Sequence, residues 1–395
     1  MKAIIAVLAL FSLALPSWAT GKKITVAQLE DTLRSMQQDK KSDSDIATEL
    51  KQLELTEELT RTRMNGLVKY AAGPYSTEQI YVLEARSATL APPESDLPAT
   101  PAPDDAAQKA MLARAANYVT HSYDQLPAFT ATRTTLRFQD NVEAVAASSG
   151  ITGSATDVVT SSGFSNPAYF VHYINSTKTQ VSLDRGTEKL PEENQKIPWG
   201  ANKMIALQEP PPSLNAVFRQ AQQGGEIKWL RWELINGKPA AVFSFDVPRK
   251  VSKMQVKVCC FPKLDQQGIA HFYNSLTAPA FGGSAGGGVS GDWQTSTEWH
   301  DFHANPPFHG ELFIDPDTGA VARMITRAEL KDTDVVHQVD TRIDYGAIKA
   351  GARTLVVPVK SYINTLVVPG GDSGAASYTT RCTLFTSEYS DYQTE

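Results

Sequence analysis

Three histidines, His300, His303 and His309, lie within ten residues of one another and are the side chains in this chain best suited to binding a metal ion. A glutamate and an aspartate add carboxylates to the same segment. A zinc or copper site needs about three such ligands that converge, and a zinc-bound water would make the protein a metal-dependent hydrolase. However, the spacing is not the helical His-Glu-x-x-His pattern, and Pro306-Pro307 separates His309 from the others. We therefore expect exposed loop histidines.

The tetrapeptide Gly-Asp-Ser-Gly at residues 371–374 matches the sequence around the nucleophile of chymotrypsin-like proteases. A catalytic triad also needs a buried base and an orienting acid, and no histidine here stands in the Ala-Ala-His-Cys context of that family. We interpret the tetrapeptide as a flexible turn. Because no other constellation predicts a reaction, we expect a protein that is not an enzyme and needs no cofactor.

The three cysteines, Cys259, Cys260 and Cys382, leave two interpretations open. Alternation along a strand over residues 254–260 puts Cys259 and Cys260 on opposite faces, so only one of them can point toward a given partner. One interpretation is a disulfide from one of the two to Cys382, which would fix the C-terminal segment. The other is three thiols, at least one of them buried. No second cysteine pair has zinc-site spacing, so we expect no metal there.

The first 19 residues have the features of a signal peptide. They contain a positive start at Lys2, an apolar run over 3–16 and small residues before a cleavage point near Ala19. We therefore expect a periplasmic or secreted protein. No later apolar run approaches the length that a membrane span needs, so we expect no transmembrane segment in the mature chain.

The chain has 395 residues, with 37 Lys and Arg against 43 Asp and Glu, for a formal net charge of −6. A mildly acidic chain without a basic stripe lacks the electrostatic footprint of a nucleic-acid-binding protein. The length allows two domains, each large enough to bury its own core.

Residues 20–90 have helical periodicity and predict an N-terminal module of short helices. Thr25 with Gln28 forms a capping-box pattern at the first helix start. Further helix starts are expected at Asp43 to Asp45, Thr56 and Ser76. The proline-rich residues 91–105 cannot continue a helix and predict an extended linker.

The remaining chain, residues 106–395, predicts one more helix over 106–123 and then an antiparallel β domain. Strands are expected over 129–138, 169–174 and 179–183, followed by a short helix from Ser213 and by hairpins around 236–237, around 315–319 and between 335–345 and 354–368. The Asn-Gly pair at 236–237 is the dipeptide that a type I′ turn prefers.

These hairpins have one apolar and one polar side. With Asn236-Gly237 as the turn, Trp232 lies on the face of Phe243 and Phe245, whereas Trp229 falls on the opposite, polar face. In the last hairpin Ile343 and Tyr345 share the apolar face, and Arg342 and Asp344 share the polar one. Such a sheet must cover its apolar face, and the helix from Ser213 or the N-terminal helices are available for this.

The segment Phe308–Asp315, the Asp-Pro-x-Thr-Gly turn, Arg323 and the strand pair ending at Pro358 resemble the lipoprotein-sorting (LolA-like) half-barrel proteins of the bacterial envelope. The resemblance covers the β region, although those carriers are shorter and lack a helical segment like Thr25–Tyr123. Residues 53–59 and the strand that carries Trp229 and Trp232 also resemble a group of exported bacterial proteins of uncharacterised function. The LolA-like resemblance implies an α+β fold in which a large curved antiparallel sheet wraps a helix.

The resemblance also implies a hydrophobic concavity that receives acyl chains or a partner protein. We therefore expect non-catalytic binding of an apolar or acyl-bearing ligand, such as a lipid or lipoprotein, or of an envelope protein. The residues expected to form the apolar lining or core are Trp229, Trp232, Phe243, Phe245, Phe313 and Tyr345. The glycine-rich segment 281–291, with aromatic residues on both sides, is a candidate lid. Two alternatives stay open: the metal-dependent hydrolase, and a structural or scaffold protein of the envelope.

Overall fold

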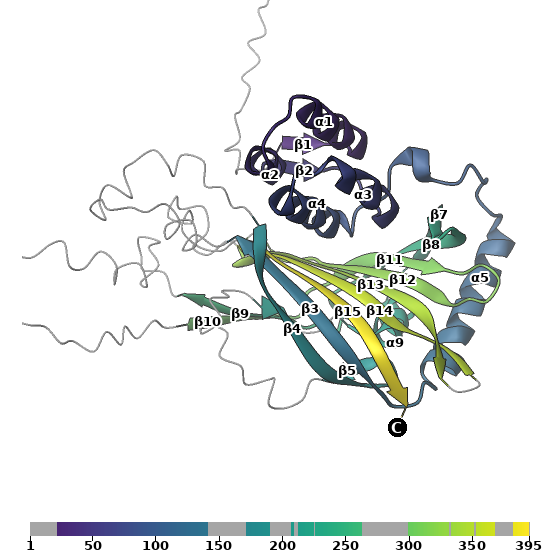
Figure 1. Cartoon of the computed structure of the whole chain (residues 1–395). Helices are drawn as coiled ribbons and strands as arrows, with labels where there is room; N and C mark the ends of the chain where they lie inside the picture. Colours follow the sequence, from purple (N-terminus) through teal and green to yellow (C-terminus); the bar gives the residue numbers. More distant parts are fainter. Residues whose placement is uncertain are drawn as a thin grey trace, which may run out of the picture.

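The structure is a computed structural model of the chain. It describes residues 22–140, 171–189, 207–208, 212–224, 226–262, 299–331, 333–350, 353–367 and 382–394. The expected signal peptide, the tetrapeptide at 371–374 and the glycine-rich segment 281–291 lie outside the described residues. Within them the fold is α+β: a group of short helices precedes a large, unclosed antiparallel sheet, as expected (Figure 1).

The N-terminal module, residues 22–90, combines short helices with a small parallel sheet. Its elements are β1 (Lys22–Ile24), α1 (Val26–Gln38), α2 (Asp43–Lys51), β2 (Leu53–Leu55), α3 (Arg61–Leu67), the 3₁₀ turn η1 (Val68–Tyr70) and α4 (Pro74–Ser87). A core of its own holds these elements together, with Leu29, Leu33, Leu50, Met64 and Ile80 among its fully buried members. The β1–β2 pair was not expected, because strands of three residues carry almost no alternating pattern.

The helix starts follow the capping chemistry of the sequence. The capping box is confirmed: Gln28 N donates to Thr25 Oγ1 at 3.2 Å, and Thr25 N donates to Gln28 Oε1 at 2.9 Å. Helix α2 begins at Asp43 with Ser42 as its N-cap. The start expected at Thr56 is wrong, because residues 53–55 pair with β1 and Thr60 caps α3 instead.

The proline-rich segment leads along the sheet to a second helical region. Its elements are the 3₁₀ turn η2 (Glu94–Asp96), α5 (Asp105–Tyr118) and the π-helical turn η3 (Val119–Tyr123). Pro101 O accepts a hydrogen bond of 2.9 Å from Trp232 Nε1, so this segment contacts the sheet. Helix α5 is capped by Asp104 and runs along one end of the sheet (Figure 1).

The large sheet has ten strands in the order β5-β4-β3-β15-β14-β13-β12-β11-β8-β7, and each described neighbouring pair is antiparallel. Their bounds are β3 (Phe129–Asp140), β4 (Val171–Asp184), β5 (Thr187–Lys189), β7 (Ile227–Ile235), β8 (Lys238–Val247), β11 (Phe308–Ile314), β12 (Val321–Ala328), β13 (Val336–Ala350), β14 (Arg353–Val367) and β15 (Cys382–Thr394). Since β5 and β7 stand at opposite ends of this order, the sheet is not closed.

Two details of this sheet differ from the expectation. The separate strands expected over 169–174 and 179–183 are one continuous strand, β4. Strand β15 was not expected at all, and it lies between β14 and β3, so the end of the chain pairs with the first strand of the sheet. A smaller sheet has the order β10-β9-β6, from β6 (Leu207–Gln208), β9 (Val256–Pro262) and β10 (Trp299–Ala304).

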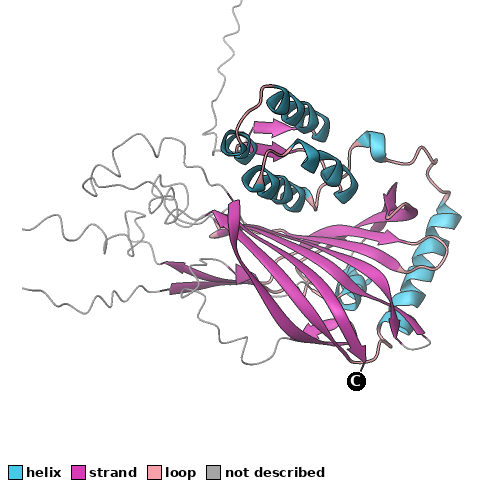
Figure 2. Cartoon of the chain, in the orientation of Figure 1, coloured by secondary structure: helices cyan, strands magenta, loops and turns pink. Residues whose placement is uncertain are grey.

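Helical segments cover the two faces of the large sheet differently (Figure 2). The inner face, which carries Phe243, Phe245 and Tyr345, packs against α5, η3 and α9 (Leu214–Gly224). The covering side chains are Met111, Ala115, Val119, Tyr123, Leu214, Val217, Phe218 and Ala221. The outer face carries Arg342 and Asp344 and meets the N-terminal module. The helix expected from Ser213 therefore covers the apolar face, whereas the N-terminal helices cover the polar one.

The Asn236-Gly237 turn provides a test of local backbone chemistry. Gly237 has a φ of 76°, and a Cβ there would meet nothing within 4 Å. Gly237→Ala should therefore lower the free energy of unfolding by about 1 kcal/mol, through backbone strain alone. Gly66→Ala is the matched control, since its Cβ also meets nothing but the residue lies in helix α3. It should raise stability by up to about 1 kcal/mol in the same urea titration. Equal effects would contradict the turn assignment.

Candidate functional site

Five of the six aromatic residues expected to line a ligand site belong to the core on the inner face. Phe243 and Phe245 on β8 and Tyr345 on β13 are buried in the core beneath α9 and η3. Trp229 and Trp232 on β7 are partly buried against the same core. The rings of Trp229 and Phe243 are 5.6 Å apart in an edge-to-face contact. Five of the six expected residues are therefore brought together.

The expected face of Trp229 is wrong, because a β-bulge interrupts β7. Trp229 pairs with Phe243, but the next paired residue on β7 is Arg231, opposite Val242. The extra residue, Leu230, shifts the alternation, so that Trp229 and Trp232 lie on the same face. Their ring centroids are 5.0 Å apart. A bulge leaves no mark in the apolar pattern, and sequence alone could not place it.

Phe313 is the expected lining residue that lies elsewhere. It pairs with Val242 on β8 and belongs to a small cluster on the outer face together with Ile325. The guanidinium groups of Arg231 and Arg323 lie over its ring, at 5.8 and 5.2 Å from the centroid. Phe313 therefore supports charged side chains instead of lining the inner face.

The histidines of the proposed metal site are divided between two sheets. His300 and His303 are in β10 of the small sheet, and His309 is in β11 of the large one. His303 is exposed, and the side chain of His300 lies outside the described part of the structure. His309 Nδ1 is 3.1 Å from Glu329 Oε1. Within the described part of the chain, no group of three His, Cys, Asp or Glu residues could hold a metal ion.

The cysteine pairing stays a prediction. Cys259 and Cys260 are in β9, and their side chains lie outside the description. Cys382 begins β15, and its Sγ is 3.5 Å from Asn364 Oδ1 on β14.

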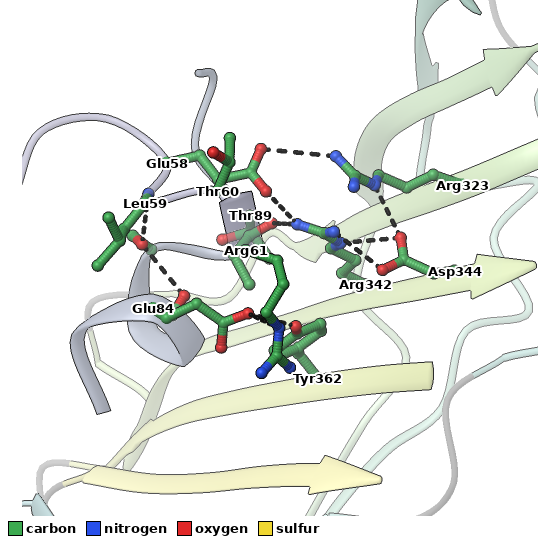
Figure 3. Close-up of polar contacts among 12 residues, drawn as sticks. Glu58, Leu59, Thr60, Arg61, Glu84, Thr89, Arg323, Arg342, Asp344 and Tyr362 are labelled. Carbon is green, nitrogen blue, oxygen red and sulfur yellow. Dashed lines mark hydrogen bonds and ion pairs between the residues drawn. The ribbon is translucent and has the colours of Figure 1, made fainter. Parts of the chain in front are cut away.

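On the outer face a cluster of buried ion pairs joins the sheet to the N-terminal module (Figure 3). We call Glu58, Glu233, Arg323, Arg342 and Asp344 the outer-face ion cluster. Glu58 precedes α3 and reaches Arg342 Nη1 at 2.5 Å and Arg323 Nη1 at 3.5 Å. Asp344 accepts from Arg323 Nε at 2.7 Å and from Arg342 Nη2 at 2.9 Å. Glu233 accepts from Arg323 Nη1 at 3.2 Å. The five side chains come from three strands and one loop.

The charges of this cluster stabilise one another. Burial alone would raise the pKa of Asp344, but the Arg323 and Arg342 charges outweigh it and lower that pKa to about 2. Burial would lower the pKa of Arg342, and the charges of Asp344 and Glu58 raise it well above its usual value. Arg342 Nη1 also donates to Ala88 O of the module at 2.9 Å. A charge here that lost its partners would be strongly destabilising.

A second polar contact, beside the ion cluster, joins α4 to the sheet. Tyr362 Oη on β14 donates to Glu84 Oε1 at 2.8 Å, and Arg61 Nε is 3.5 Å from the same oxygen. Burial raises the pKa of Glu84, so its surroundings favour the neutral acid. Around this contact Val82 and Ala85 of α4 pack against the sheet.

Sequence reasoning missed the role of the outer face. It recognised that Arg342 and Asp344 share a polar face, but the pattern of a polar face is the same whether water or another module covers it. The residue that could have indicated the contact between the module and the sheet is Glu58, but the helical pattern placed it inside an expected helix. No local pattern connects Glu58 with strands that follow it by more than 200 residues.

Comparison with known proteins assigns no family to the chain. No protein-family model and no curated protein matches it. A solved structure that matches is the complex of Pseudomonas aeruginosa MucA and MucB, with 9% sequence identity, a TM-score of 0.20, and coverage of 74% of this chain and 99% of that one. The LolA-like resemblance therefore stays a prediction. No helix among the described residues is long and apolar enough to cross a membrane.

The outer-face ion cluster predicts a large effect of removing Arg342. Arg342→Met leaves Glu58 and Asp344 without one of their buried partners, and should lower the free energy of unfolding by about 3–5 kcal/mol in a urea titration. Arg34→Met is the control, because Arg34 pairs with Glu30 on the surface of α1, and it should cost at most about 0.5 kcal/mol.

The double variant Glu58→Leu/Arg342→Met tests whether the two side chains act as a pair. Removing both should recover about 1 kcal/mol or more of the loss seen in Arg342→Met alone. Additive losses would show that Glu58 and Arg342 do not interact in solution.

The contributions of Asp344 and Glu84 to the free energy of unfolding should change with pH in opposite directions. The folded-state pKa of Asp344 is about 2, below its usual 3.8, so its contribution of about 2 kcal/mol is complete above about pH 4 and is lost as pH falls toward 2. The penalty for Asp344→Asn should therefore grow as pH rises over that window. The pKa of Glu84 is raised above its usual 4.5, so ionised Glu84 is destabilising above that pKa.

Glu84→Gln should accordingly become less harmful, or stabilising, as pH rises from 4 toward neutrality. Unfolding free energies at a series of pH values give both slopes. Parallel slopes for the two variants would contradict the assigned environments.

Proposed function

We propose that this chain is an exported, non-catalytic binding protein of the bacterial envelope, which takes an apolar or acyl-bearing ligand or an envelope partner on the inner face of a LolA-like half-barrel. The proposal includes periplasmic or secreted localisation after removal of residues 1–19. One observation carries it: the N-terminal module occupies the outer face through buried ion pairs, and the aromatic side chains of the unclosed sheet gather on the inner face.

The short helix α9 is the part of the inner-face cover that a ligand could most easily replace. It is an 11-residue helix whose Leu214, Val217 and Phe218 pack on the sheet. Arg219 forms an ion pair with Asp124, and Asn215 Nδ2 donates to Asp124 Oδ1 at 2.7 Å. The ion pair contributes little stability. The main contribution is the apolar area of Leu214, Val217 and Phe218, and an acyl chain that buried a similar area in their place could displace the helix.

Solvent extraction and probe binding test this function. The mature chain, purified from an envelope fraction, should release stoichiometric acyl-bearing lipid into organic solvent, identified by mass spectrometry. The stripped protein should bind the neutral apolar fluorophore N-phenyl-1-naphthylamine. Asp124→Ala loosens α9, and should tighten probe binding about threefold to fivefold, which corresponds to about 1 kcal/mol of contacts.

Asp184→Ala is the control, because it removes an exposed ion pair with Lys189 beside the β4–β5 turn. It should leave probe binding unchanged. Absence of both extracted lipid and probe binding would refute the proposed function and favour the scaffold alternative. Stoichiometric zinc in elemental analysis would instead favour the hydrolase.

A further inference from the structure

Strand β7 is a long edge of the large sheet. The order of described strands ends in β5 on one side and in β7 on the other, and β5 has three residues whereas β7 has nine. No backbone hydrogen bond in the described part of the chain joins β7 to a segment other than β8. Natural sheets shorten, charge or cover such an edge, because its free N–H and C=O groups pair readily with another strand. Strand β5 is protected by its shortness, whereas β7 needs another protection or a partner.

The exposed side chains of β7 are mainly apolar. Leu230 and Leu234 are 45% and 48% exposed. Lys228, near the start of the strand, is its exposed charged residue. A bulge can itself discourage pairing at an edge, but the one at Leu230 leaves residues 231–235 in unbroken register with β8. Most of β7 therefore presents a regular, apolar edge without the exposed charges that keep other strands away.

The sequence of β7 is complementary to itself in one antiparallel register. Directly paired residues of antiparallel strands point to the same face, so a two-fold axis passes between two copies of one residue. With the axis at Trp232, Leu230 lies opposite Leu234 of the second copy. The same register puts Arg231 opposite Glu233, so opposite charges meet. An axis at Arg231 or at Glu233 would instead set two like charges against each other, which is destabilising.

We propose that two copies of this chain pair through β7 into an antiparallel dimer whose two large sheets are continuous. Residues 229–235 of one strand overlap the same residues of the other when the axis passes at Trp232. The interface is symmetric, so the assembly closes after two subunits. Trp232 Nε1 donates to Pro101 O, and this side-chain contact does not use the backbone of the edge.

The dimer would join the aromatic side chains of two inner faces. The ring centroid of Trp232 is 5.0 Å from that of Trp229, which is 5.6 Å from that of Phe243, so a row of rings runs from β8 to the edge. In the proposed register Trp232 of the second copy stands directly opposite, with Cβ atoms about 5 Å apart. Each copy therefore adds a residue to the aromatic row of the other. Dimerisation needs no ligand, so its test is independent of the proposed binding function.

Sedimentation equilibrium of the mature protein tests the dimer. It should show a reversible monomer–dimer equilibrium with a dissociation constant of about 1–100 μM, as expected for an interface below the standard size. Leu234→Lys should raise that constant at least about tenfold, because each dimer contains the substitution twice and lysine is a residue that protects natural edges. Leu136→Lys is the matched control, since Leu136 is 39% exposed on the interior strand β3, and it should leave the dimer unchanged. Both variants replace exposed side chains, so their thermal midpoints should match that of the parent protein.

Cysteine cross-linking tests the register. Leu230→Cys and Leu234→Cys chains that carry different tags are mixed and oxidised. They should form a mixed cross-linked dimer, because the register places the two positions directly opposite each other, within reach of a disulfide. Each variant alone should give only the background of the parent protein, which has three cysteines of its own. Two copies of residue 230 are about 13 Å apart along the strands, which is too far for a disulfide.

Three results would overturn the proposal. A protein that stays monomeric up to about 1 mM would leave the edge to a strand of another protein or to none. A dimer that Leu234→Lys does not weaken would be held by a different surface. Cross-linking of Leu230→Cys with itself, in preference to Leu234→Cys, would show that the strands pair in another register.

Discussion

The structure depends on the pairing of buried charges between the N-terminal module and the outer face of the sheet. Glu58 lies between Arg323 and Arg342, and both arginines also bind Asp344. Buried ion pairs contribute little net stability relative to apolar packing, but removing one partner is costly. Their main effect is therefore on orientation, because a shift of the module by one residue along the sheet would leave charges unpaired. The apolar contact of α4 with Tyr362 supplies the attraction that the charges then orient.

Different segments of the chain cover the two faces of the sheet. An unclosed sheet has two large surfaces to cover, and here separate segments cover them: residues 22–90 on the outside, and residues 105–123 with 214–224 on the inside. The outer cover has its own core, whereas α9 is a short helix whose apolar side is buried against the sheet and η3. The inner face is also where the aromatic side chains of β7, β8 and β13 are buried or partly buried.

Local chemistry was predictable from sequence, and long-range pairing was not. The Thr25 capping box and the Asn236-Gly237 turn depend on neighbours within a few residues, and both are present as expected. The alternation along β13 correctly separated Tyr345 from Arg342. The outer position of Phe313 and the pairing of β15 with β3 depend on distant partners, and the bulge beside Trp229 leaves no mark in the apolar pattern. The same limit applies to the site: the alternating pattern indicated its aromatic residues, whereas the contacts of Glu58 with Arg323 and Arg342 became visible only in the fold.

The most direct test of this division of faces is amide hydrogen exchange of the mature protein, measured by mass spectrometry with and without saturating N-phenyl-1-naphthylamine. If the ligand occupies the inner face, exchange should slow in β8 and β13, which carry the inner-face aromatic residues, and accelerate in α9, while residues 22–90 keep their free-state rates. Changed exchange in the N-terminal module, with no change in α9 or in those strands, would place the ligand on the outer side and contradict the account.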